Sequence, residues 1–125
     1  MRIILTRSVK RWLNKEKEIT EEDILPVAKE VSDGNYDADL GGNLFKKRIS
    51  NSSNKGKSGG SRIIIGYKQG SNIFLIEAFN KNDKDNISKN EKTALKNRCK
   101  FYLRFDSSTI DRLIKEKEFY EIKED

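Results

Sequence analysis

The segment 62–67, RIIIGY, constrains the fold more than any other part of this sequence. It is almost continuously apolar, which is typical of a strand that lies inside a sheet and is buried on both faces. Turn residues at 69–72 and a second apolar run at 73–79 follow it, so we expect a hairpin there. Residues 44–49, LFKKRI, alternate with a period of two and add a strand before the loop. These segments predict an antiparallel meander.

Helical patterns lie on both sides of this meander. Residues 8–15 place Val9, Trp12 and Leu13 on one helical face, after a possible short strand at 3–5. Thr20 predicts the start of a second helix that ends near 33–34, with a turn at 40–43 before the meander. A capping box at Ser88 and Glu91 opens a long helix that runs to about Arg104, and Ser108 or Thr109 could cap a last helix before a charged tail.

This order predicts a single α+β domain over residues 1–125, a small twisted antiparallel sheet with helices packed against it.

Composition excludes several classes of function. The chain has no apolar run of 18 residues, and the apolar stretch at 3–5 is too short for a signal peptide. A single cysteine, Cys99, cannot form an internal disulfide and is predicted to be a small core residue. We therefore expect a protein of the reducing cytoplasm without a membrane partner. The absence of histidine removes the usual general base and the commonest zinc ligand.

Charge is strongly segregated along the chain, whose formal net charge is +6. No acidic residue occurs between Leu40 and Ile76, whereas acids gather at 16–39 and near the C-terminus. Such a distribution is typical of a protein that binds a polyanion, most often nucleic acid. The cations of this acid-free segment are Lys46, Lys47, Arg48, Lys55, Lys57, Arg62 and Lys68.

Two motifs that suggest a small ligand are incomplete in this sequence. Gly56-Lys57-Ser58 looks like the end of a P-loop, but Asn51 stands where the first glycine is needed and a strand follows instead of a helix. The segment 80–86 suggests a calcium loop but has interleaved lysines and no glycine at the turn. We expect no metal and no cofactor.

The cations could instead act on RNA. Lys46 and Arg48 lie two apart on a strand and therefore point to one face of the sheet, beside the strand entered at Arg62. RNA supplies its own nucleophile, the 2′-hydroxyl, so a protein needs to remove its proton, neutralise the phosphorane and protonate the leaving oxygen. Arginine suits the second task, and a lysine crowded by other cations can serve as base or acid.

Three segments carry a resemblance to a known family: DADLGGNLFKKRI at 37–49, GKSGGSRIII at 56–65 and FNKNDKDNIS at 79–88. Together with DRLIKEKEFYEI at 111–122, this set resembles the RelE/ParE toxin superfamily, most closely its HigB-like branch of RelE toxins. The resemblance covers most of the chain. It implies a small twisted antiparallel sheet with helices on one side.

The resemblance also implies a function, that of a type II toxin which cleaves mRNA on the ribosome and is neutralised by a cognate helix-turn-helix antitoxin. The family's functional positions fall on Lys46, Arg48, Lys57, Arg62 and Lys81. On this reading Arg48 and Arg62 would clamp the scissile phosphate, and Lys46 or Lys57 would accept the proton. Lys81 or Lys84 would serve as the acid.

The remaining cations are expected to bind RNA or the ribosome: Lys47, Lys55, Lys68 and Lys84.

Two other functions use the same basic surface. A ParE-like toxin would poison gyrase, although such relatives generally lack the complete basic set. A non-catalytic module would bind nucleic acid without cutting it. Growth arrest accompanied by cut messages would separate the nuclease from both alternatives.

Overall fold

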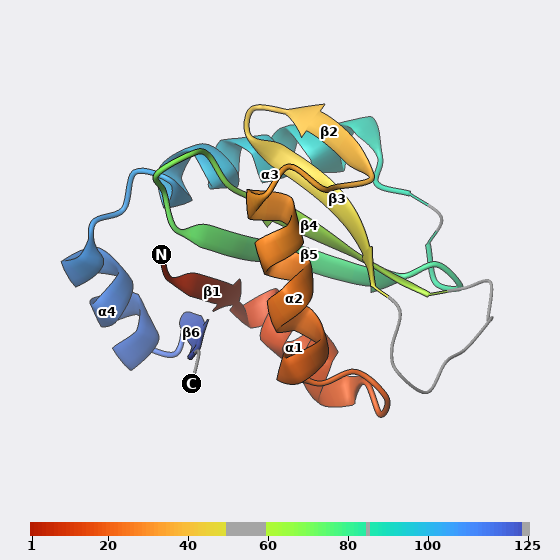
Figure 1. Ribbon diagram of the computed structural model, residues 1–125, viewed down its shortest axis with the longest axis horizontal. Helices are drawn as coiled ribbons and strands as arrows, with labels where there is room; N and C mark the ends of the chain where they lie inside the picture. The colour runs from red at the N-terminus through yellow and green to blue at the C-terminus, as the bar shows by residue number, and fades with distance from the viewer. Residues whose placement is uncertain (50–59, 85, 124–125) are drawn as a thin grey trace.

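A six-stranded sheet with the order β2-β3-β4-β5-β1-β6 organises the chain, and helices pack on both of its faces (Figure 1). The computed structural model describes residues 1–49, 60–84 and 86–123. Helices and strands are mixed along the chain, which confirms the predicted α+β class. The elements are β1 (Ile3–Thr6), α1 (Arg7–Lys15), α2 (Glu21–Ser32), β2 (Ala38–Gly41), β3 (Leu44–Ile49), β4 (Ser61–Gly66), β5 (Ile73–Asn80), α3 (Lys89–Tyr102), α4 (Ser107–Lys115) and β6 (Phe119–Ile122).

The predicted antiparallel meander is confirmed as β3, β4 and β5. Leu44 pairs with Gly66 at one end of the β3–β4 ladder, and Ile49 pairs with Ser61 at the other. The strand β4 lies between two partners and is buried along most of its length, as its apolar sequence predicts. This central hairpin positions the basic residues of β3 against those of β4.

The prediction of a wholly antiparallel sheet is wrong for one strand pair. The short strand β1 pairs in parallel with β5, so that Ile3 lies opposite Ile73 and Leu5 opposite Leu75. A parallel pair needs a long crossover connection, and here α1, α2 and three strands provide it. The sheet is therefore mixed.

Two further strands were predicted as a turn and a tail. Gly41 ends β2, which pairs with β3 across a tight turn at Gly42 and Asn43. The predicted charged tail contains β6, which pairs antiparallel with β1 and buries Phe119 and Ile122. Both strands have only four residues, which is too short for a period of two to stand out from the neighbouring sequence.

Helices cover both faces of the sheet, whereas the family resemblance implied one. On the first face, α1 and α2 pack Val9, Leu13 and Ile24 over β4 and β5. On the second face, α3 and α4 contribute Leu95, Cys99 and Ile110 to a separate core. The predicted core position of Cys99 is confirmed, since this thiol is fully buried and burial raises its pKa to about 11. The second face carries the candidate site.

Local sequence sets the helix starts. The Thr20 N–H donates to the Asp23 carboxylate at 2.9 Å, and Ser88 and Glu91 form the predicted capping box of α3. The start of α4 was predicted two or three residues late, because the capping residue is Asp106, which accepts the Thr109 N–H, rather than Ser108 or Thr109. None of the helices described by the structure has the length and apolar character needed to cross a membrane.

Candidate functional site

Two arginines face each other on neighbouring strands of the second sheet face. Arg48 of β3 lies directly opposite Arg62 of β4, and Arg62 lies opposite Phe79 of β5. Phe79 belongs to the core on the side of α3 and α4, so all three side chains share that face. Residues opposite each other in a ladder have Cβ atoms about 4.5–5.5 Å apart. We call these three residues the arginine row.

Arg48 and Arg62 place two positive charges opposite each other in the ladder, and like charges in this position repel. The Arg48 side chain is exposed and forms no ion pair within the described part of the chain. Its backbone N–H donates to the Asp37 carboxylate at 2.6 Å, which fixes the strand. One Arg62 N–H group donates to the Ser61 carbonyl at 3.4 Å. A guanidinium group can bind two oxygens of a phosphate through parallel N–H donors.

Lys46 extends this cationic surface along β3. It lies opposite Ile64, which belongs to the same core as Phe79, so Lys46 faces the same side as the arginine row. The Lys46 ammonium donates to the Asn86 side chain at 3.5 Å, from the segment that follows β5. The prediction that Lys46, Arg48 and Arg62 come together on one face is confirmed.

A β-bulge brings a carboxylate to this face, and the sequence analysis missed it. The β4–β5 register shifts between Ile64 and Ile65, so that Ile64 lies opposite Glu77, Ile65 opposite Leu75, and Ile76 is the extra residue. The Glu77 carboxylate accepts a hydrogen bond from the Ser8 hydroxyl of α1. Bulges commonly redirect a side chain next to a functional site. A lone acid within the apolar run IFLIEAF was the only signal in the sequence.

Lys84 reaches the arginine row from the segment after β5. Its ammonium lies 5.5 Å from the centre of the Phe79 ring and forms an ion pair with Glu91 in the first turn of α3. The hydrogen bond from Lys84, together with the backbone hydrogen bond at Ser88, lowers the pKa of Glu91 to about 2. Glu91 therefore stays ionised and holds Lys84 near the row.

Lys81 is exposed in the turn that ends β5. Its backbone N–H donates to the Gly60 carbonyl at 3.2 Å, which extends the β4–β5 ladder by one step beyond Asn80. Asn80 itself accepts hydrogen bonds from Trp12 and Ser61, which fix the ends of both strands. The backbone of Lys81 thus lies next to the strand ends that carry Arg62 and Phe79, and its side chain is exposed.

Two predicted RNA-binding lysines lie away from this cluster. Lys47 points to the opposite face of the sheet, where it forms an ion pair with Glu30 of α2 at 3.5 Å. Alternation along β3 dictates this, since Lys46 and Arg48 occupy the other face. Lys68 lies in the turn between β4 and β5, at the end of the hairpin remote from Arg62. Lys55 and Lys57 lie outside the described residues.

The described residues contain no group of three or more metal-binding side chains. The charged groups that converge here are instead cations, with the carboxylates of Glu77 and Glu91 beside them. This combination matches the needs of phosphate chemistry at an RNA backbone.

The family described as "RelE toxin of RelE / RelB toxin-antitoxin system" matches residues 1–122, almost the whole chain. A comparison with curated proteins found no significant match. Assignment to the HigB-like branch stays a prediction. The match, together with the basic face of the sheet, shows that the chain belongs to the RelE family of toxins from toxin–antitoxin systems.

Proposed function

We propose that this toxin is an endoribonuclease that cleaves mRNA on the ribosome, without a metal ion. The single observation that supports this most strongly is the arginine row, where Arg48 and Arg62 lie opposite each other on one face of the sheet. Two guanidinium groups on neighbouring strands can bind the oxygens of one phosphate together, because each guanidinium presents parallel N–H donors. Membership of the RelE family supports the same reaction class.

In the proposed reaction, the 2′-oxygen of one nucleotide attacks the adjacent phosphorus atom, and the bond from phosphorus to the 5′-oxygen breaks. Arg48 and Arg62 stabilise the charge on the phosphorane. Lys46 or Lys57 accepts the 2′-hydroxyl proton. Lys81 or Lys84 gives a proton to the leaving 5′-oxygen, and the position of Lys84 beside Phe79 supports the second choice. The products are a 2′,3′-cyclic phosphate and a 5′-hydroxyl.

The proposed partners are the ribosome with its message and a cognate antitoxin. The family match supports an antitoxin partner, since it describes toxins of two-component toxin–antitoxin systems. We propose that the antitoxin is a helix-turn-helix protein.

The test is a reconstituted translation reaction on a defined message, with cleavage sites mapped by primer extension with and without ribosomes. We expect cuts only on translated message. Removing one charge-stabilising donor typically costs about 10²–10³ in rate, so Arg62→Ala should nearly abolish them. The matched control is Arg112→Ala, which removes the same charge from an exposed position on α4.

Either of two results would contradict the proposal. Wild-type cleavage by Arg62→Ala would exclude the arginine row as the site. Intact message with the unmodified toxin would favour a binding module or a gyrase poison, which a DNA supercoiling assay would then separate.

A further inference from the structure

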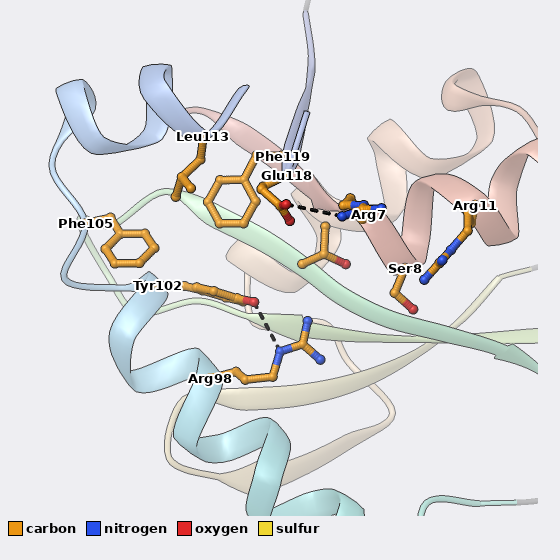
Figure 2. Close-up of a pocket in the computed structure, with 10 residues that line it drawn as sticks. Arg7, Ser8, Arg11, Arg98, Tyr102, Phe105, Leu113, Glu118 and Phe119 are labelled. Atoms are coloured by element: carbon orange, nitrogen blue, oxygen red, sulfur yellow. Dashed lines mark hydrogen bonds and ion pairs between the residues drawn. The ribbon is translucent and has the colours of Figure 1, made fainter. Parts of the chain in front are cut away.

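A second site lies beside the second face of the sheet, where residues of α1 meet those of α3 and α4 (Figure 2). It is a pocket of about 610 Å³, within the usual range for a small-ligand site. Its lining combines aromatic rings with arginines that come from separate elements. The residues that matter here are Arg7, Arg11, Arg98, Tyr102, Phe105 and Phe119.

The aromatic wall of this pocket is held rigid by contacts among its own rings. Tyr102 meets Phe119 edge to face with ring centres 5.3 Å apart, and it meets Phe105 at 5.8 Å. Phe119 is buried beneath, whereas Tyr102 and Phe105 remain half-buried. The latter two rings therefore offer a preformed apolar surface to a flat ligand.

The rim of the pocket carries an excess of positive charge. Arg7 is paired with Glu118 at 3.2 Å, the only carboxylate among the lining residues. Arg98 donates to the Tyr102 hydroxyl at 3.1 Å, with its guanidinium carbon 5.7 Å from the ring centre. Arg11 is exposed and forms no ion pair within the described part of the chain. Two of the three arginines are thus left for an anionic ligand.

The pocket adjoins the arginine row. Ser8 lines the pocket and donates to Glu77, the residue that the bulge places on this face. Glu77 lies two residues before Phe79, which is about 6–7 Å along a strand. An extended chain of nucleotides held at the arginine row can therefore continue directly into the pocket.

We propose that this pocket binds one nucleotide of single-stranded RNA, next to the phosphate held by Arg48 and Arg62. The base lies against the rings of Tyr102 and Phe105, and Arg11 and Arg98 bind its phosphate. Proteins commonly recognise single-stranded RNA by stacking bases on aromatic rings and arginine planes. The inference rests on the proposed function, because it takes RNA to be the ligand of this face.

The test measures binding and not cleavage. A trinucleotide with 2′-O-methyl groups throughout cannot be cut by 2′-hydroxyl attack, and isothermal titration gives its Kd. We expect Arg11→Gln and Arg98→Gln each to weaken binding about tenfold, because each removes a charge-assisted hydrogen bond. Arg112→Gln, which removes the same charge from exposed α4, should bind as the wild type does. Unchanged binding by both pocket variants, or equal losses in all three, would overturn the proposal.

The base is tested separately with adenosine 5′-monophosphate and ribose 5-phosphate. We expect the nucleotide to bind at least tenfold more tightly, and Phe105→Leu to remove most of this difference, since stacking is worth about 1–3 kcal/mol per base. Equal affinity for the two probes, or no binding of either, would overturn the proposal that the pocket binds a base. Loss of cleavage without loss of trinucleotide binding contradicts only the proposed function, so the two failures are distinguishable.

Discussion

At the scale of single residues, Gly66 has the least room for a larger side chain among the glycines that the structure describes. A Cβ atom there would lie 2.6 Å from the Cys99 sulfur and 3.1 Å from the Ile76 side chain. Both neighbours are fully buried, so neither can move into solvent. We expect Gly66→Ala to lower the free energy of unfolding by about 1–3 kcal/mol, the usual cost of overpacking. Urea denaturation followed by circular dichroism measures the change.

The double variant Gly66→Ala with Cys99→Ala provides the control. Removing the sulfur relieves the closest contact, so the two changes together should destabilise less than the sum of the single changes. We expect a coupling of about 0.5 kcal/mol or more. Strict additivity would show that the α3–β4 contact is not the cause.

Arg48 is predicted to depend on its shape as well as its charge. A guanidinium can bind two phosphate oxygens in one plane, whereas an ammonium is a point charge. We expect Arg48→Lys to cut message about tenfold or more slowly in single turnover, with a nearly unchanged salt dependence of RNA binding. Wild-type rates in Arg48→Lys would mean that this position only attracts RNA.

The residues of the site differ in how far they could be predicted. Lys46, Arg48 and Arg62 were predictable because a period of two places the first two on one face and the hairpin brings the third beside them. The place of Glu77 could not be predicted, because the direction of its side chain depends on a bulge that becomes visible only in the register of two paired strands. Arg11 and Arg98 come from helices whose relative placement depends on packing alone.

At the scale of elements, the first turn of α3 links stability to pH. The pKa of Glu91 is lowered from 4.5 to about 2, chiefly by the hydrogen bond from Lys84. A lowered pKa means that this contribution to stability is present above about pH 4.5 and is lost as the pH falls toward 2. We expect Glu91→Gln to show a smaller loss of Tm between pH 6 and pH 3 than the wild type.

The contribution of the Glu91 charge to stability can be separated from that of the Ser88 cap. Ser88→Ala removes the hydroxyl that caps the Glu91 N–H and should cost about 1 kcal/mol at both pH values. If Glu91→Gln loses as much Tm on acidification as the wild type, other carboxylates dominate the acid response.

Elements were predictable where the sequence pattern was long. The helix start at Ser88 and the strand 44–49 match the structure, because a capping box and six alternating residues are strong local signals. The short strands β2 and β6 were not predicted, since their pairing is decided by the partner strands β3 and β1. The parallel position of β1 likewise depends on contacts some 70 residues away.

At the scale of the whole molecule, positive charge gathers at both ends of the central hairpin. The arginine row occupies one end. At the other end, a pocket of about 340 Å³ is bordered by cations from α3, from the turn after it and from the β4–β5 turn, and none of them forms an ion pair within the described part of the chain. Six-residue strands separate the ends by roughly 20 Å. These cations are Lys68, Lys96, Lys100 and Arg104.

Cations spaced four apart on α3 destabilise an isolated helix, which suggests a polyanionic partner for this end too. We expect Lys68→Gln and Lys100→Gln each to lower the slope of log affinity for the ribosome against log salt by about 0.7–0.9. The rate of single-turnover cleavage should stay unchanged. Lys115→Gln on α4 is the matched control. If all three variants change the slope equally, this placement of the RNA is contradicted.

The place of β1 in the sheet has a consequence for how the toxin is made. Its two neighbours are β5 and β6. Ile3 therefore cannot pair until Ile73 has been made, and Thr6 cannot pair until Phe119 has been made. A ribosome that translates this message therefore carries an unfinished sheet until residues 119–122 have been joined. The meander with the arginine row can form earlier, but the wall that Phe119 supplies to the neighbouring pocket cannot. The order of synthesis thus delays the complete face that we propose binds RNA until residues 119–122 have been made.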